Sequence, residues 1–217
     1  MALLNITLIS SFHKIHGNCN PRELYKIIEH LQPDVIFEEL STNGFEIIYS
    51  PYYQPETIEA ITVKQYLQKY PIKHFPVDNY PVNENDLLSD AQIIWDNSME
   101  YRELWNEKLT RLNESGYYFL NSDKCTEIID RLTRIEEAVL TETKNIKLLN
   151  EHKTEKLLHD KRETEMLRSI YDIASQHPFD KSVFICGAEH RQGIKKKLKE
   201  FETKESNKIK WTFFNEI

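Results

Sequence analysis

The sequence Ser-Val-Phe-Ile-Cys-Gly-Ala-Glu-His-Arg-Gln-Gly, residues 182–193, carries the clearest structural signal in the chain. Its apolar part, Val183 to Cys186, is made of residues that favour strands and predicts a short buried strand. Gly187 and Ala188 then remove side-chain bulk where the strand should turn into a helix. The helix itself is predicted from apolar residues at i, i+4 and i+7, which would form its buried face. These residues are Ile194, Leu198 and Phe201.

Three ionisable residues occupy the junction between this strand and its helix: Glu189, His190 and Arg191. In open α/β sheets, ligands bind outside the carboxyl ends of the strands. We therefore expect a functional site at this corner of the sheet, provided that other parts of the chain bring residues to it.

The composition indicates one globular domain over residues 1–217, because a chain of this length can bury a substantial core. Hydrophobic residues make up 40% of the chain, which argues against disorder. The formal net charge of −7 argues against a nucleic-acid partner. The N-terminus lacks the pattern of a signal peptide, and no apolar run is long enough to span a membrane. Three cysteines at unrelated spacings favour a reducing compartment, so we expect a cytoplasmic protein.

The N-terminal part of the chain predicts a strand, a helix and a second strand. The strands are expected at residues 5–10 and 34–40, and Asn20, Pro21 and Glu23 form a capping pattern for the helix between them. Short connections of this kind predict that the two strands are parallel neighbours. Both strands would then bring polar side chains to the same edge of the sheet. These side chains are His13, His16, Glu38 and Glu39.

The remaining chain predicts two further strands and a long helical region. Residues 73–77 favour a third strand, which Asp78 follows, and residues 209–214 favour a last one. Residues 84–176 contain apolar side chains at helical spacing and no strand pattern. We therefore expect an α/β fold, with a mostly parallel or mixed sheet flanked by helices. The all-helical insertion over residues 84–176 would form a lid or a subdomain.

Arg162 lies in the last helix of this insertion, on the same side as the apolar residues Leu158 and Met166. An arginine on a buried face is rarely left without a partner. We therefore expect Arg162 to meet a carboxylate or an anionic ligand.

Two kinds of chemistry suit the polar residues that these elements would bring together. Histidines and carboxylates could hold a divalent metal ion with open positions for water, with His13, His190 and Glu39 as the candidate ligands. Alternatively, a carboxylate could activate water while histidines and an arginine stabilise the oxyanion. Both point to hydrolysis.

Each of these residues also has a purely structural interpretation. The histidines could contact only solvent, the carboxylates could cap helices or pair with lysines, and Asp78 could be a turn residue. Arg162 could form a structural ion pair. Alternation along the second strand favours Glu39 facing inward and Glu38 facing the opposite side.

Three motifs resemble the TraB/Tiki/erythromycin-esterase superfamily: Ser10-Ser11-Phe12-His13, the second strand from Pro33 to Leu40, and Gly187-Ala188-Glu189-His190. The family pattern has two Gly-x-x-His motifs, a glutamate at the end of the second strand, and an arginine on a helix before the last motif. By this resemblance the family residues fall on His13, Glu39, Arg162 and His190. Ser10 stands where the family has glycine.

A second alignment of the first motif is also open. His16 and Gly17 resemble the Glu-x-x-His-Gly motif of the erythromycin-esterase branch, with His13 in the place of its glutamate. The resemblance implies an α/β core, a helical insertion and a hydrolase-like site. Its members are described as metal-dependent proteases, as esterases with a histidine–glutamate pair, and as haem-binding lipoproteins.

The leading hypothesis from the sequence is a hydrolase of an ester or amide bond in a small-molecule or peptide substrate. Its function could depend on Mn²⁺, Co²⁺ or Zn²⁺. The candidate catalytic residues are Glu39, His13, His16, His190, Arg162, Glu189 and Arg191, and the candidate substrate-binding residues are Asp78 and Glu38. The alternative is a non-catalytic binder of haem or an anionic metabolite in the same pocket. The long helices could also form a homodimer.

Overall fold

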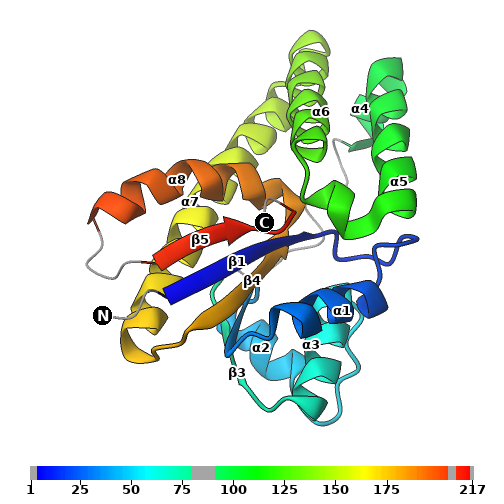
Figure 1. Cartoon of the computed structure of the whole chain (residues 1–217). Coiled ribbons are helices and arrows are strands. Elements are labelled where there is room, and N and C mark those ends of the chain that lie inside the picture. The colour runs from blue at the N-terminus through cyan, green and yellow to red at the C-terminus, as the bar shows by residue number, and fades with distance from the viewer. Residues whose placement is uncertain (1–3, 80–90, 205–208, 216–217) are drawn as a thin grey trace.

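The computed structural model describes residues 4–79, 91–204 and 209–215 (Figure 1). Within these residues, a five-stranded, all-parallel β-sheet is flanked by eight α-helices, with a long helical stretch in the middle of the chain. The strand order is β3-β2-β4-β1-β5. The predicted α/β class is confirmed. The strands are β1 (Leu4–Ser11), β2 (Val35–Glu38), β3 (Lys73–Pro76), β4 (Lys181–Gly187) and β5 (Ile209–Phe213).

Strand β4, which contains the apolar run from Val183 to Cys186, lies at the centre of the sheet. It pairs with β1 on one side and with β2 on the other, in both cases in parallel. The prediction that β1 and β2 are neighbours is therefore wrong, because β4 lies between them. Every residue of β4 after Lys181 is buried. A nearly continuous apolar strand is the one best suited to the central position, where both faces are covered.

Helices cover both faces of the sheet. Ile36 packs with the α1 and α3 side, whereas Phe37, one residue later, packs with the α7 and α8 side. This alternation determines which face each side chain at the end of β2 will reach. The helices of the two layers are α1 (Pro21–Leu31), α3 (Ile58–Lys69), α7 (Ile146–Gln176) and α8 (Arg191–Lys204).

Local sequence signals explain where these helices begin. Asn20 caps α1, its side chain accepts a hydrogen bond from the backbone N–H of Glu23, and Pro21 is the first helical residue, as predicted. A single 3₁₀ turn at Ala188–His190 separates β4 from α8. Ile194 and Leu198 of α8 are buried, as their spacing predicts.

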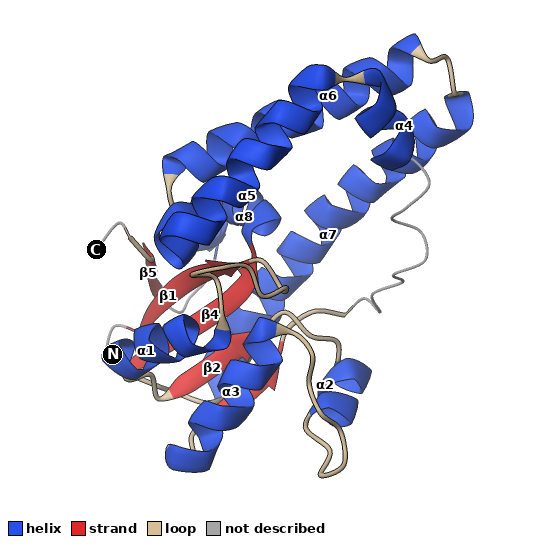
Figure 2. Ribbon diagram, turned by 90° about the vertical axis from the view of Figure 1, so that its right-hand side faces the viewer, coloured by secondary structure: helices blue, strands red, loops and turns tan. Residues whose placement is uncertain are grey.

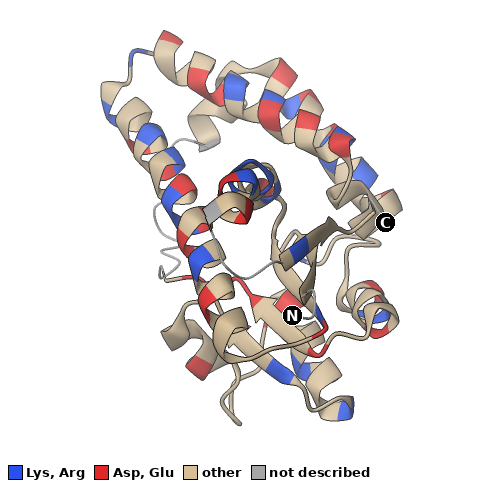
Figure 3. Ribbon diagram, turned by 60° about the vertical axis from the view of Figure 1, so that its left-hand side comes forward, with Lys and Arg blue, Asp and Glu red and all other residues tan. Residues whose placement is uncertain are grey.

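The helical middle of the chain stands beyond the carboxyl ends of the strands (Figures 1 and 2). The start of the predicted insertion at residue 84 lies outside the described residues. Acidic and basic residues are interspersed along the long helices (Figure 3), as expected of solvated helix faces. The helical middle consists of α4 (Ala91–Asn97), α5 (Met99–Leu120), α6 (Asp123–Glu142) and α7. A separate short helix, α2 (Thr42–Ile48), follows β2.

Helix α5 is anchored to the end of β1. The buried side-chain amide of Asn121, which follows α5, accepts a hydrogen bond from Ser10 N at 2.8 Å and donates one to Ser10 O at 3.2 Å. Gly116 has a positive φ of 52° and bends α5 there. A side chain at Gly116 would overlap the backbone of Asn18, so the glycine allows α5 to contact the loop after β1.

Helix α7 belongs both to the helical middle and to the sheet. Its C-terminal half packs on the sheet through Met166, Leu167 and Ile170, which are fully buried. Leu158, predicted on the same inward face, is instead 38% exposed, because the helix at that point has already left the sheet. The helical middle therefore shares one continuous helix with the α/β core.

Within the described residues, none of the helices combines the length and the hydrophobicity needed to cross a lipid bilayer. All three cysteines are buried free thiols.

Candidate functional site

Glu39 lies at the centre of a group of charged side chains at the carboxyl end of the sheet. Its backbone N–H still bonds to Ile185 O of β4, which fixes the residue directly beyond the end of β2. Its Oε2 accepts a hydrogen bond from Gly187 N at 2.6 Å. Its Oε1 lies 2.7 Å from Nη2 of Arg162 and 3.2 Å from Nε2 of His190. Segments from three distant parts of the chain therefore meet at one carboxylate.

Arg162 joins Glu39 to Asp78. Its Nε and Nη2 atoms donate to Oδ2 of Asp78 at 3.1 and 2.6 Å. The side chain of Arg162 is 13% exposed and that of Asp78 only 2%. The prediction that Arg162 meets a carboxylate is confirmed, and its guanidinium contacts two of them.

His190 is held between two carboxylates. Its Nε2 faces Glu39, and its Nδ1 lies 3.3 Å from Oε1 of Glu163. The other oxygen of Glu163 lies 3.1 Å from Nζ of Lys197. Because a neutral imidazole has a single N–H, donation to both carboxylates requires the doubly protonated ring.

Glu163 was not predicted as a site residue, although it directly follows Arg162. A second signal in the sequence is Gly193, three residues after His190. A side chain at Gly193 would overlap the carboxylate of Glu163, so this glycine leaves the space through which Glu163 reaches His190. Glycine in the first turn of a helix costs stability, so its presence there indicates that close packing leaves no room for a side chain.

His13 approaches the same place from the loop after β1. It has a positive φ of 62°. Its Nδ1 lies 3.2 Å from Oε1 of Glu59, and its side chain is 47% exposed. A Cβ atom on Gly187 would lie 2.9 Å from Nε2 of His13 and 3.5 Å from Oε2 of Glu39. Gly187 therefore allows His13 and Glu39 to face each other across the end of β4.

Glu59 is the second functional candidate that the sequence did not reveal. It lies in the first turn of α3, where an acidic residue is common for reasons of the helix dipole alone. Its carboxylate binds both the ring and the backbone N–H of His13. We call Glu39, Asp78, Arg162, Glu163, His190, His13 and Glu59 the Glu39 cluster.

The pKa values in the Glu39 cluster follow from these contacts. Burial alone would raise the pKa of Glu39, but the hydrogen bond and charge of His190, with further contributions from His13 and Gly187, lower it to about 2. Burial alone would lower the pKa of His190, but Glu163 and Glu39 raise it to about 9. For His13, Glu59 likewise outweighs burial and raises the pKa to about 9. The cluster is therefore strongly ion-paired at neutral pH.

The structure places four predicted site residues outside the Glu39 cluster. The ring of His16 contacts Leu109 O at 3.1 Å, so it holds the loop against α5. Glu38 faces the opposite side of the sheet, where it binds Tyr49 and His74, the latter at 2.7 Å. Burial there raises the pKa of Glu38. The alternation of side chains along β2 explains why Glu38 and Glu39 lie on opposite faces of the sheet.

The other two predicted site residues that lie outside the Glu39 cluster are Arg191 and Glu189. The guanidinium of Arg191 is buried and lies 4.8 Å from the ring centroid of Phe213, on the β5 side. Glu189 points away from the cluster, is 58% exposed, and lies 3.9 Å from Nζ of Lys108 on α5. A turn of 3₁₀ helix rotates consecutive side chains in different directions, so only His190 of the three reaches Glu39.

The arrangement of the candidate metal ligands favours ion pairing over coordination. Among the described residues, no three His, Cys, Asp or Glu side chains are grouped so that they could hold a metal ion. Glu39 accepts from Arg162, His190 and Gly187, and His190 has a carboxylate at each ring nitrogen. A metal ion at His13, His190 and Glu39 would have to displace these donors and a proton. These residues as arranged do not fit a divalent metal, and no step below depends on one.

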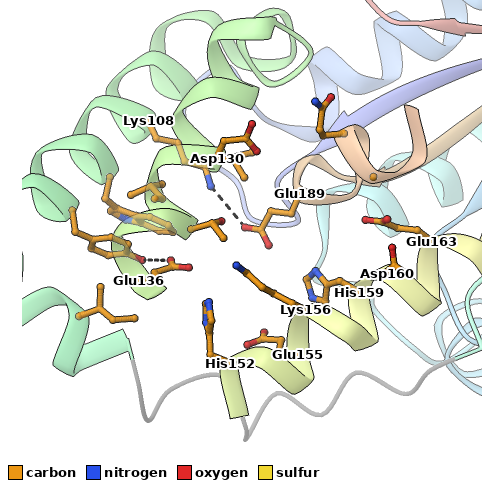
Figure 4. A pocket seen from close by; sticks show the side chains of 18 of the residues that line it. Lys108, Asp130, Glu136, His152, Glu155, Lys156, His159, Asp160, Glu163 and Glu189 are labelled. Atoms are coloured by element: carbon orange, nitrogen blue, oxygen red, sulfur yellow. Dashed lines mark hydrogen bonds and ion pairs between the residues drawn. The ribbon is translucent and has the colours of Figure 1, made fainter. Parts of the chain in front are cut away.

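A cavity of about 580 Å³ adjoins the cluster on the side of the long helices. Figure 4 shows its charged lining, in which Lys108 and Glu189 approach each other from α5 and from the turn before α8. Glu163 and His159 line it as well, so the cavity and the Glu39 cluster share a wall. The ring of His159 lies 5.0 Å from that of His190. We call this cavity the helical pocket.

Comparison of the chain with protein-family models, with curated proteins and with solved structures finds no match.

Proposed function

We propose that this chain is a hydrolase of an ester or amide bond, with His13 as the residue that moves the proton. The observation that carries the proposal is the position of His13. Its Nδ1 is fixed by the carboxylate of Glu59, and its Nε2 faces Glu39 beside Gly187. Half of its side chain is exposed, so a substrate can reach the ring.

Glu59 supports this role by selecting one form of the ring. When His13 gives up a proton, Glu59 retains the proton on Nδ1, and the lone pair remains on Nε2. In the proposed reaction, Nε2 takes a proton from the attacking water as its oxygen bonds to the carbonyl carbon. The same proton then passes to the leaving alcohol or amine when the tetrahedral intermediate breaks down.

The other charged residues of the Glu39 cluster have a positioning role in this proposal. Arg162 and His190 are both bound to carboxylates, so they hold Glu39 and Asp78 in place and offset their charge. Glu39, with a pKa of about 2, is too weak a base to activate water at neutral pH but keeps its negative charge beside His13. In this proposal His13 is the base, in place of the carboxylate that the sequence suggested as the group that activates water.

The alternative of a non-catalytic binder of haem or an anionic metabolite depends on spare positive charge in the cluster. Arg162 and His190 both bind carboxylates, so that alternative has less support than the hydrolase. Haem added to the purified protein would give an absorbance band near 400 nm if it were bound through an axial ligand.

The test is hydrolysis of a panel of p-nitrophenyl esters and anilides by the purified chain and by three histidine variants. We expect His13→Ala to lower kcat/KM by about 10²–10⁴-fold, the usual contribution of a general base. His16→Asn tests the other alignment of the motif and should retain most of the activity. His30→Ala, on the surface of α1, controls for the loss of any histidine. Activity that survives in His13→Ala but not in His16→Asn would overturn the proposal.

A further inference from the structure

The helical pocket has polar side chains where helices of this length usually present apolar ones. On α7, His152, Lys156, His159 and Glu163 recur at helical spacing and line the pocket. Across from them, α5 contributes Tyr101, Trp105 and Lys108. A helix that directs a polar stripe inwards is suited to a ligand rather than to packing. The volume of about 580 Å³ lies within the range of small-molecule sites.

Lys108 places a buried ammonium in this pocket. Its side chain is only 3% exposed, and the Glu189 carboxylate it faces is 3.9 Å away, farther than a hydrogen bond. Its Nζ lies 4.8 Å from the ring centroid of Trp105. A buried ammonium has three protons to donate, so it suits a carbonyl or another oxygen of a ligand.

The pocket as a whole has an excess of negative charge. Three lysines line it, and Lys156 already binds Glu137 outside it, at 2.5 Å. Burial and the nearby charge of His190 lower the pKa of His159, so this histidine adds no positive charge at neutral pH. Six carboxylates line the pocket, and two of them, Asp160 and Glu163, are paired with Lys197, which lies outside it. The other four still outnumber Lys108 and Lys196: Asp130, Glu136, Glu155 and Glu189.

Lining residues of the pocket lie near the loop that carries the proposed catalytic residue, His13. Glu189 lines it and contributes to the electrostatic environment of His13. Lys108 lies 5.6 Å from the ring centroid of Phe12, the residue before His13. A ligand oxygen held by Lys108 would therefore lie on the side of the pocket nearest Phe12, which precedes His13 in the chain.

We propose that the helical pocket binds the substrate and selects a compact ester or amide that carries a protonated amine. Its carbonyl oxygen would face Lys108, and its ammonium would lie among the carboxylates of α6 and α7. The inference rests on the proposed hydrolase function, which it extends to a substrate class. The charged lining also argues against a large apolar ligand such as haem.

The test measures binding of three probes of similar size to the His13→Ala protein, so that turnover does not interfere. The probes are alaninamide, whose amine is protonated below its pKa, N-acetylalaninamide, which is neutral, and succinamate, which is an anion. Calorimetry and NMR shift mapping should show alaninamide binding about tenfold or more tightly than either of the others. Shifts should map to α5 and α7 around Lys108 and His159.

Variants of the pocket make the test specific. Asp130→Asn with Glu155→Gln should remove most of the preference for the amine. Lys108→Met, which keeps the apolar stem, should weaken both amides about tenfold. Glu151→Gln, on α7 outside the pocket, is the matched control and should change neither. Thermal unfolding confirms that each variant is folded.

Equal binding of the three probes, preference for the anion, or binding of none of them would overturn the substrate class. None of these outcomes depends on catalysis. If the binding preference failed, a loss of hydrolysis in His13→Ala would still support the proposed base. If His13 proved not to be the base, the binding preference would still support the proposed substrate class.

Discussion

The guanidinium of Arg162 lies 2.7 Å from the carboxylate of Glu39, across 123 positions of sequence. This contact joins the last helix of the helical middle to the end of β2, and Asp78 extends it to the segment after β3. The Glu39 cluster therefore depends on three separate parts of the fold being assembled together.

Removal of Arg162 should strongly destabilise the protein. Arg162→Met would remove the cation that the buried carboxylates of Glu39 and Asp78 share, and we expect a loss of about 3–5 kcal/mol in the free energy of unfolding. Urea denaturation measures it. The exposed pair of Lys26 and Glu23 has the same 2.7 Å separation, so Lys26→Met serves as a control that should cost less than about 1 kcal/mol. Equal losses in the two variants would contradict the importance of burial.

A methyl group at position 193 should destabilise the protein by displacing Glu163. Alanine normally improves a helix by about 1 kcal/mol over glycine, but Gly193→Ala would overlap the Glu163 carboxylate. We expect a net loss of about 1–3 kcal/mol, measured by urea denaturation. Gly44→Ala, in helix α2 with only Ser41 Oγ nearby at 3.2 Å, should have a much smaller effect. In a Glu163→Ala background the penalty at position 193 should largely disappear.

The stability that His190 provides should be lost in alkaline solution. Its pKa rises from 6.5 to about 9 on folding, so the folded state binds the proton more tightly than the unfolded state. The contribution, about 3 kcal/mol, is complete below pH 6.5 and vanishes as the pH rises through about 9. The difference in unfolding free energy between wild type and His190→Asn should therefore shrink over this interval. A difference that is constant with pH would contradict the ion-paired imidazolium.

Glu59 should determine the titration of His13. The carbon-bound ring proton of His13, followed by NMR, should titrate at about pH 9, and Glu59→Gln should lower the midpoint towards 6.5. Because the proposed base acts in its neutral form, kcat/KM should rise with pH up to about 9 in the wild type. In Glu59→Gln the rise should end at lower pH. Glu56→Gln, on the exposed segment before α3, should leave both midpoints unchanged.

Divalent metals should not stabilise the protein. Metal binding at His13, His190 and Glu39 would have to displace Arg162 and a proton, so Mn²⁺, Co²⁺ or Zn²⁺ should leave the Tm measured in EDTA unchanged. A rise in Tm that His190→Ala abolishes would restore the metal site that the sequence suggested. Hydrolysis measured in EDTA is an independent test, because an enzyme that needs no metal should keep its activity there.

The sequence predicted the parts of this fold that depend on local signals. The apolar run of β4, the cap of α1 at Asn20 and the position of Arg162 are each explained by residues within one turn or strand. It did not predict the order of the strands, because pairing of β1 with β4 rather than with β2 depends on competition between distant segments. For the same reason, Glu59 and Glu163 look like ordinary helix residues until His13 and His190 are brought against them.

The choice between His13 and His16 also needed the tertiary structure. Both follow β1 closely. In the structure the His13 ring lies beside Gly187, whereas the His16 ring contacts α5. The proposed homodimer stays a prediction. Leu157, 73% exposed on α7, is a candidate for its interface, and light scattering of the full chain measures it.

The continuity of α7 has a mechanical consequence. Its 31 residues form one continuous helix, with His152 in the pocket at one end of the polar stripe, Arg162 and Glu163 at the other, and the sheet beyond them. If a ligand in the pocket tilted the outer end of this helix, the guanidinium of Arg162 that contacts Glu39 would move with it. Binding in the helical pocket and the position of Glu39 would then be coupled through one continuous helix.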